Sequence, residues 1–163
     1  MTFICNAGPV IALAKIDHLH LLRDLSDSVF IPETVFHEVL AKPGVDADRI
    51  ISASRIFLKV SPALETIDPN VQFASRHLDA GEKQVIALTS TIPKPVTAIL
   101  DDAAGRRVAS QLGIPLLGFI GILLVAKRRN LIKSVHPLIE NARFNGYWLS
   151  DELLQVAKSL AGE

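Results

Sequence analysis

The sequence is poor in cysteine, methionine, tryptophan and tyrosine, each of which occurs only once in 163 residues. A single cysteine excludes an internal disulfide and a zinc site built from several cysteines, and it fits a reducing cytosol. Cys5 belongs to a short apolar segment near the start of the chain. We therefore expect it to be a small core residue and not a nucleophile.

An excess of charge of one sign is also absent. Seventeen lysines and arginines balance seventeen aspartates and glutamates, so the formal net charge is zero. Nucleic-acid binding would therefore depend on local patches and not on a global field. The largest basic cluster is Lys127, Arg128, Arg129 and Lys133. We interpret it as favourable charge at a helix C-terminus, in preference to an RNA contact.

No apolar run is long enough to cross a bilayer. The longest nearly uncharged stretch, residues 114–126, is interrupted by Pro115, Gly118 and Gly121. The first residues lack the basic and apolar regions of a signal peptide. Hydrophobic residues at 49% and charged residues at 21% are typical of a folded globular chain. The sequence therefore predicts a cytoplasmic protein with no membrane partner.

Short apolar segments alternate with segments of helical periodicity along the chain. The expected strands are residues 2–5, 29–31, 56–60, 96–100 and 115–117. The expected helices include residues 33–41, 69–78, 82–90 and 102–112. Near-continuously apolar strands separated by helices predict a parallel sheet covered on both faces, which is a three-layer α/β/α fold.

One domain accounts for the whole chain, residues 1–163. Its last part, about residues 120–163, reads as helices that pack on the rest. We expect Tyr147 and Trp148 to pack the last of these helices against the body of the domain.

Polar residues follow two of the predicted strands. Asn6 comes after the first strand, and Asp101 and Asp102 come after the strand at 96–100. Glu38 stands in the helix after the second strand, and Glu82 stands in the first turn of a later helix. In open α/β sheets the pocket lies beyond the carboxyl ends of the strands, so these side chains could surround it.

Carboxylate and amide oxygens in such a pocket suit a hard divalent cation, Mg²⁺ or Mn²⁺. A site of this kind can activate water, neutralise a phosphate and stabilise a leaving oxygen. Simpler roles are open for each acid taken alone. Asp101, Asp102 and Glu82 stand where helix capping and the helix dipole favour acids, and Glu38 could be solvated. Arg106 and Arg107 lie about one helical turn after Asp101–Asp102, so they could contact a phosphate or form salt bridges with nearby acids.

The motifs in their order resemble those of PIN-domain proteins, most closely the VapC-like prokaryotic branch and a subgroup of unassigned function. The resemblance begins with Phe3-Ile4-Cys5-Asn6-Ala7-Gly8-Pro9 followed by an apolar helix, where the family has Asp-Thr-Ser or a variant. It continues with Ile31-Pro32-Glu33-Thr34-Val35 before Glu38, and with Asp79-Ala80-Gly81-Glu82. It closes with Ile99-Leu100-Asp101-Asp102 and Leu112-Gly113-Ile114-Pro115, so that it covers nearly the whole chain.

The resemblance implies a magnesium- or manganese-dependent ribonuclease, often the toxin of a toxin–antitoxin pair. It implies catalytic roles for Glu38, Glu82 and Asp101. Asn6, Glu38, Glu82 and Asp101 then take the four metal-ligand positions, with Asp102 as a stand-in or supporting partner. It also implies RNA as substrate, a small antitoxin protein as partner, and a homodimer.

The first acidic position departs from the family pattern. Asn6 replaces the acid, and Ala7 and Gly8 replace two residues that usually carry hydroxyls. An amide oxygen can bind a metal ion but brings no charge, so we expect weaker metal binding. The alternative to a weakened nuclease is an inactive PIN-like module that binds RNA or a protein partner, with Asn6 as a helix cap.

Overall fold

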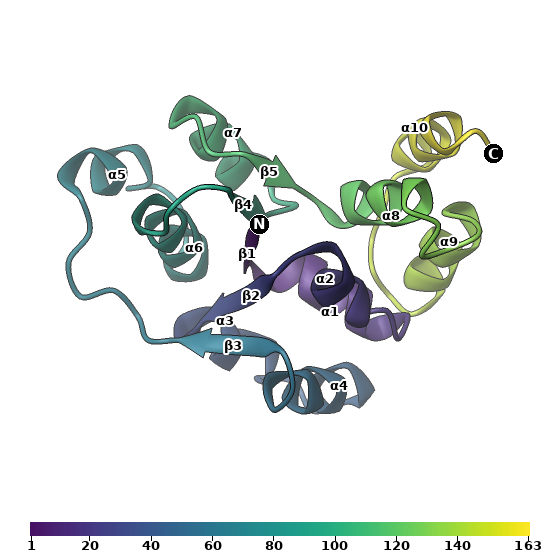
Figure 1. Cartoon of the computed structure of the whole chain (residues 1–163), viewed down its shortest axis with the longest axis horizontal. Coiled ribbons are helices and arrows are strands. Elements are labelled where there is room, and N and C mark those ends of the chain that lie inside the picture. The colour runs from purple at the N-terminus through teal and green to yellow at the C-terminus, as the bar shows by residue number, and fades with distance from the viewer.

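Five strands form one parallel sheet in the order β3-β2-β1-β4-β5, in a computed structural model that describes all residues 1–163. Helices cover both faces, as Figure 1 shows, which confirms the expected three-layer α/β/α fold. The strands are β1 (Thr2–Cys5), β2 (Ser28–Pro32), β3 (Leu58–Ser61), β4 (Val96–Ile99) and β5 (Leu116–Leu117).

Ten helices connect and follow the strands. Those before β4 are α1 (Ala7–Lys15), α2 (His20–Leu25), α3 (Glu33–Val39), α4 (Val45–Ser54), α5 (Pro69–Ala74) and α6 (Ala80–Thr91). Those after β4 are α7 (Ala103–Gln111), α8 (Phe119–Arg128), α9 (His136–Phe144) and α10 (Asp151–Ala161). None of them has the length and apolar character that crossing a bilayer requires.

Strands β1 and β4, which are neighbours in the sheet, are buried because helices cover both faces of the sheet. Every residue of β4 is buried, and Cys5 of β1 pairs in register with Ile99. Burial raises the pKa of the Cys5 thiol above its ordinary value. Cys5 is therefore a core residue without the thiolate character that a nucleophile needs.

Two predicted elements have different bounds in the structure. The strand expected from residue 56 begins at Leu58, because the chain turns at the end of α4 and leaves Ile56 75% exposed. The helix expected at 69–78 ends at Ala74. After it the backbone bonds change to the i−3 type, from the Arg76 N–H to the Phe73 carbonyl at 3.4 Å and from the Leu78 N–H to the Ser75 carbonyl at 2.9 Å, so the helical ladder does not continue.

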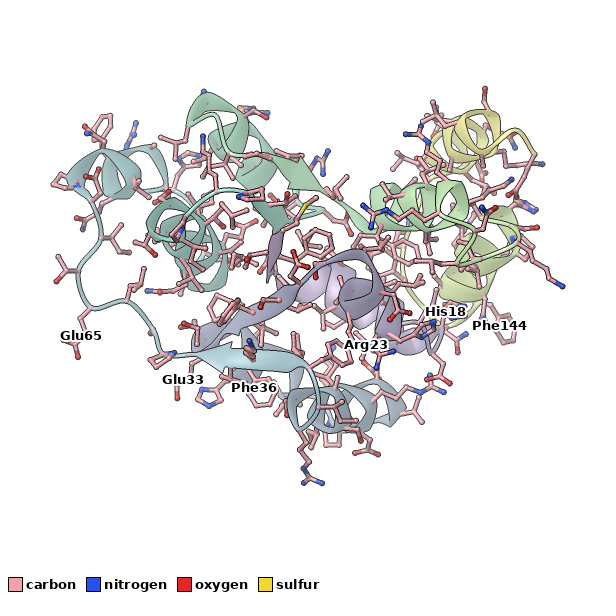
Figure 2. The ribbon with its side chains drawn as sticks, viewed as in Figure 1. His18, Arg23, Glu33, Phe36, Glu65 and Phe144 are labelled. Atoms are coloured by element: carbon pink, nitrogen blue, oxygen red, sulfur yellow. The ribbon has the colours of Figure 1, made fainter.

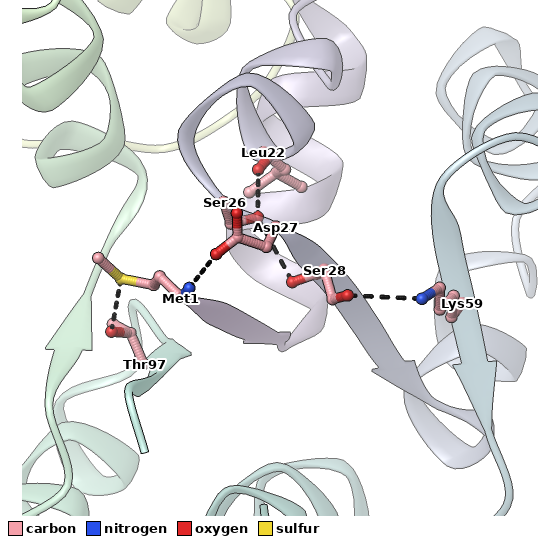
Figure 3. A network of polar contacts seen from close by, with 7 residues as sticks. All are labelled: Met1, Leu22, Ser26, Asp27, Ser28, Lys59 and Thr97. Atoms are coloured by element: carbon pink, nitrogen blue, oxygen red, sulfur yellow. Dashed lines mark hydrogen bonds and ion pairs between the residues drawn. The ribbon is translucent and has the colours of Figure 1, made fainter. Parts of the chain in front are cut away.

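Polar contacts join the amino ends of the strands, at the edge opposite the candidate site (Figure 3). The amino group of Met1 pairs with the Asp27 carboxylate just before β2. The Thr97 hydroxyl of β4 contacts the Met1 sulfur, and Lys59 of β3 donates to the Ser28 hydroxyl at 3.4 Å. The two contacts of Met1 hold β1 between its neighbours at its first residues, and the contact of Lys59 joins β3 to β2.

The C-terminal helices pack beside α1 and α2 (Figure 1). Helix α8 contacts α1 and α2, and α10 contacts α8 and α9. The Glu163 carboxylate accepts from Lys127 at 2.7 Å and from the backbone N–H groups of Val135 and His136. The last residue thus ties the end of α10 to α8 and to the start of α9, and Lys127 of the basic cluster is occupied by this contact.

Candidate metal and nucleic-acid site

The candidate site lies beyond the carboxyl ends of β1 and β4, which are neighbours in the sheet although far apart in sequence. The chain passes from β1 to β2 on one side and reaches β4 on the other, and such a reversal opens a crevice in α/β sheets. The Asn6 N–H donates to the Ile99 carbonyl at 3.0 Å. Asn6 therefore lies beside the turn that carries Asp101 and Asp102.

Asp101 and Asp102 point in different directions. The backbone at Asp102 is extended (φ −62°, ψ 133°), and successive side chains of extended backbone point to opposite sides. Asp102 accepts from the N–H groups of Ala104 at 2.7 Å and Gly105 at 3.2 Å, so it caps α7. Asp101 instead accepts from the Phe119 N–H at 2.9 Å, at the start of α8. Asp102 is the acid of the pair that acts on α6, because its carboxylate is one of the groups that raise the pKa of Glu82.

Glu82 is the most buried acid of the candidate site, with 5% of its surface exposed. A capping box holds it at the start of α6, because the Glu82 N–H donates to Asp79 at 2.8 Å and the Asp79 N–H donates back to Glu82 at 3.3 Å. Its free oxygen, Oε1, lies 3.1 Å from the place where a Cβ on Gly105 would lie. The glycine at the start of α7 thus permits the close approach of Glu82.

The acids around Glu82 repel its negative charge. Burial is the main cause that raises the pKa of Glu82 to about 7, and the neighbouring carboxylates of Asp79 and Asp102 add to it. Burial and the charge of Asp79 also raise the pKa of Glu38. Glu38 Oε2 lies 3.0 Å from the Cβ position of Gly81, so its carboxylate reaches the start of α6. Glu38, Asp79, Glu82 and Asp102 are hereafter the acidic group.

The acidic group lacks a basic partner. None of the salt bridges in the structure involves one of its four members. Carboxylates close to one another and without a counter-charge are a donor set that a divalent cation would neutralise.

The pKa of Glu82 gives a testable pH dependence. Its folded-state value of about 7 exceeds the ordinary 4.5, so the folded chain keeps a proton that the unfolded chain releases between these pH values. Stability from this group is complete below pH 4.5 and is lost as pH rises through 7. Glu82→Gln keeps an acceptor for the Asp79 N–H but removes the charge. In metal-free buffer at pH 8 we expect its melting temperature to exceed that of the wild type by about 2–4 °C, and to match it at pH 4.

Glu65→Gln is the matched control, because Glu65 points outward from the loop between β3 and α5 (Figure 2). It should leave the melting temperature unchanged at both pH values. A Glu82→Gln variant that melts below the wild type at pH 8 would contradict the charge repulsion inferred here.

Asn6 occupies the N-cap position of α1, but its side chain makes no capping hydrogen bond. The residue is only 9% exposed, and no side-chain hydrogen bond fixes its amide. Its polar atoms nevertheless keep some contact with solvent, because no fully buried side-chain N or O atom lacks a partner. The helix cap that belonged to the alternative of an inactive module is therefore absent, and the side-chain amide oxygen is free to meet a ligand.

The candidate donor atoms are of the kind that Mg²⁺ or Mn²⁺ binds, whereas the positions of the side chains do not form a complete metal site. All candidate donors are carboxylate or amide oxygens, which these cations prefer. However, no three His, Cys, Asp or Glu side chains lie close enough together to hold a metal ion as they stand. Asp101 differs from the other predicted donors because both of its oxygens accept hydrogen bonds, from the Phe119 N–H and from the Tyr147 hydroxyl.

The arginines after the site differ from each other. The guanidinium of Arg106 donates to the Leu100 carbonyl at 2.8 Å and forms no salt bridge. It therefore supports the turn after β4, which is neither of the two roles that the sequence suggested. Arg107 is exposed and without an ion pair, so it is the freer of the two for a phosphate.

The prediction for the two aromatic residues before α10 is wrong for Trp148, which is 82% exposed. Tyr147 is half-buried, and its hydroxyl donates to the second oxygen of Asp101. Burial and the charge of Asp101 raise the Tyr147 pKa, which keeps the phenol protonated as a donor. Both aromatics border a mostly apolar cavity of about 630 Å³ between α8 and α10, with Asp101 and Asp102 at one end.

Two residues of this region have roles that the sequence reasoning missed. Asp79 belongs to the acidic group, and its signal was present as the first residue of a capping-box pattern, Asp-x-x-Glu. Tyr147 reaches Asp101 across 46 residues of sequence, and no local pattern indicates such a contact.

The match to a known family agrees with the fold. A family model described as a PIN domain matches residues 2–163. No curated protein matches the chain. PIN domains have a nuclease fold, generally depend on divalent metal ions, and generally bind nucleic acid. The chain, matched over nearly its full length, belongs to the PIN-domain family.

Proposed function

We propose that this protein is a metal-dependent ribonuclease, and that it is the toxin of a toxin–antitoxin pair. The observation that carries the proposal is the buried carboxyl of Glu82, which faces Asp102 and Asp79 at the sheet edge without a basic partner. A buried carboxylate beside two like charges is costly for the folded chain, and this cost falls on Glu82. Its presence at the crevice of a PIN fold supports a role in holding a cation.

Glu38, Glu82 and Asp102 would hold Mg²⁺ or Mn²⁺, with Asn6 as a neutral oxygen donor. A bound cation supplies activation of water and neutralisation of the phosphate. Arg107, exposed on α7 beyond the acids, would contact a neighbouring RNA phosphate. Asp101 serves the site through its position beside Asp102.

RNA cleavage tests the proposal directly. Purified protein with Mn²⁺ should cut a fluorescent single-stranded RNA of mixed sequence, and EDTA should stop the reaction. Glu82→Gln and Glu38→Gln should each lower the rate by about 10–100-fold, because each removes one charge from the cation site. Glu65→Gln should cut as the wild type does. Cleavage that survives EDTA or the loss of Glu82 would refute the proposal.

The second candidate is an inactive module that binds RNA or a protein partner. It is favoured by one observation, the neutral Asn6 at the end of β1 in place of an acid. In this case RNA binding persists in EDTA, and Mn²⁺ produces neither cleavage nor a heat of binding that depends on Glu38 and Glu82.

The partners in the proposal are a small antitoxin and a second copy of the chain. A short neighbouring gene for a small antitoxin-like protein would support the toxin assignment. Light scattering of the purified protein would show whether it is a homodimer.

A further inference from the structure

Three separate segments meet at the Asp101 carboxylate. The Phe119 N–H, at the start of α8, donates to Oδ1 at 2.9 Å, and the Tyr147 hydroxyl donates to Oδ2 at 2.5 Å. A Cβ on Gly118 would lie 2.3 Å from Oδ1, so only glycine allows this approach. Both oxygens are thus held by neutral donors, and the carboxylate has one orientation.

Tyr147 is itself held in place by two other parts of the chain. Its ring packs edge-on against Phe119, with ring centres 5.5 Å apart and planes at 63°. Its backbone N–H donates to the Ala142 carbonyl at the end of α9 at 2.9 Å. The hydroxyl is therefore presented to Asp101 by packed neighbours and not by a free loop. The bond from the Tyr147 hydroxyl to Asp101 is the only side-chain hydrogen bond that joins residues 145–163 to the turn after β4.

That turn also carries Asp102. The Leu100 N–H donates to the Leu117 carbonyl at 2.8 Å, and Arg106 donates to the Leu100 carbonyl. Asp101 comes next, and the α7 cap follows with Asp102. The Asp102 carboxylate is held on one side by the Ala104 and Gly105 N–H groups, and the contacts of Asp101 hold the residue that precedes it.

We propose that Tyr147 is a positioning residue of the candidate site, which acts through Asp101 to aim Asp102 at Glu82. The inference rests on the proposed function, because a role for Tyr147 in aiming a metal ligand requires that the acids bind a metal ion. It makes the segment between α9 and α10 part of the metal site. The two neighbouring acids then have divided roles. Asp102 belongs to the acidic group, and Asp101 is the anchor that keeps it there.

Tyr147→Phe tests this with the loss of one oxygen atom, and Trp148→Phe is the matched control at an exposed neighbour. Amide NMR spectra of the metal-free proteins report the Asp102 cap directly, since Ala104 and Gly105 donate to it. In Tyr147→Phe the amide signals of Ala104 and Gly105 should shift together with that of Phe119. In Trp148→Phe all three should stay in place.

Calorimetric titration with Mn²⁺ gives the second measurement. Tyr147→Phe should bind about tenfold more weakly than the wild type, the lower end of the loss seen when a supporting partner of a ligand is removed. Asp101→Asn should do the same, and the double variant should be no weaker than either single one, because both changes break one contact.

Unshifted Ala104 and Gly105 amides in Tyr147→Phe would overturn the inference, since Tyr147 would then only anchor the C-terminal segment. If the wild type binds Mn²⁺ and Tyr147→Phe binds it with the same affinity, the inference is overturned as well. If the wild type binds no Mn²⁺, the proposed function fails, and the amide shifts still decide whether Tyr147 positions Asp102.

Discussion

Asn6→Asp should raise the affinity for Mn²⁺ by about 10–100-fold. The residue lies at the carboxyl end of β1, beside the turn that carries Asp102, and its side-chain amide has no hydrogen-bonding partner in the chain. The change exchanges a neutral oxygen donor for a charged one of nearly the same size. A hard divalent cation gains from the added charge, whereas the metal-free protein has one more carboxylate at a position that is only 9% exposed.

The two states should therefore respond in opposite directions. Without metal the variant should melt below the wild type, and saturating Mn²⁺ should raise its melting temperature by more than it raises that of the wild type. Asn70→Asp, an exposed position near the start of α5, should show neither effect. A variant with unchanged Mn²⁺ affinity would show that the pocket has been lost more widely than at Asn6.

Phe119→Ala should lower the free energy of unfolding by about 3–5 kcal/mol. Phe119 has no exposed surface, and its ring packs against Tyr147 while its N–H binds Asp101. Truncation leaves a cavity where α8 begins and removes the support of Tyr147. Urea unfolding, monitored by the fluorescence of the single tryptophan and by circular dichroism, measures the loss.

Phe144→Ala is the control, because it removes the same phenyl ring from an exposed position. Phe144 is 91% exposed at the end of α9, where Figure 2 shows it pointing outward, so its loss should change stability by no more than about 0.5 kcal/mol. Equal effects of the two substitutions would contradict the packing described for Phe119.

Pattern and composition were sufficient for the architecture. The apolar segments at 2–5 and 96–100 predicted buried parallel strands, and both are strands with covered faces. The motif order predicted a PIN domain, which the family match confirms. These features follow from local spacing, because a strand buried on both faces is apolar throughout and a helix repeats every 3.6 residues. The sequence also placed Asn6 directly after β1, Glu82 in the first turn of α6 and Asp102 at the start of α7, where the structure has them.

The sequence alone determined the three-layer fold and most of the candidate oxygen donors, and only the tertiary structure added Asp79 and decided which of these side chains face one another. Asp101 and Asp102 are adjacent and chemically equal, yet extended backbone turns one to Glu82 and the other to Tyr147. The partners of both come from helices and loops far away in sequence. Local spacing determines which face of an element a residue occupies, whereas the contact across elements depends on how the whole chain packs.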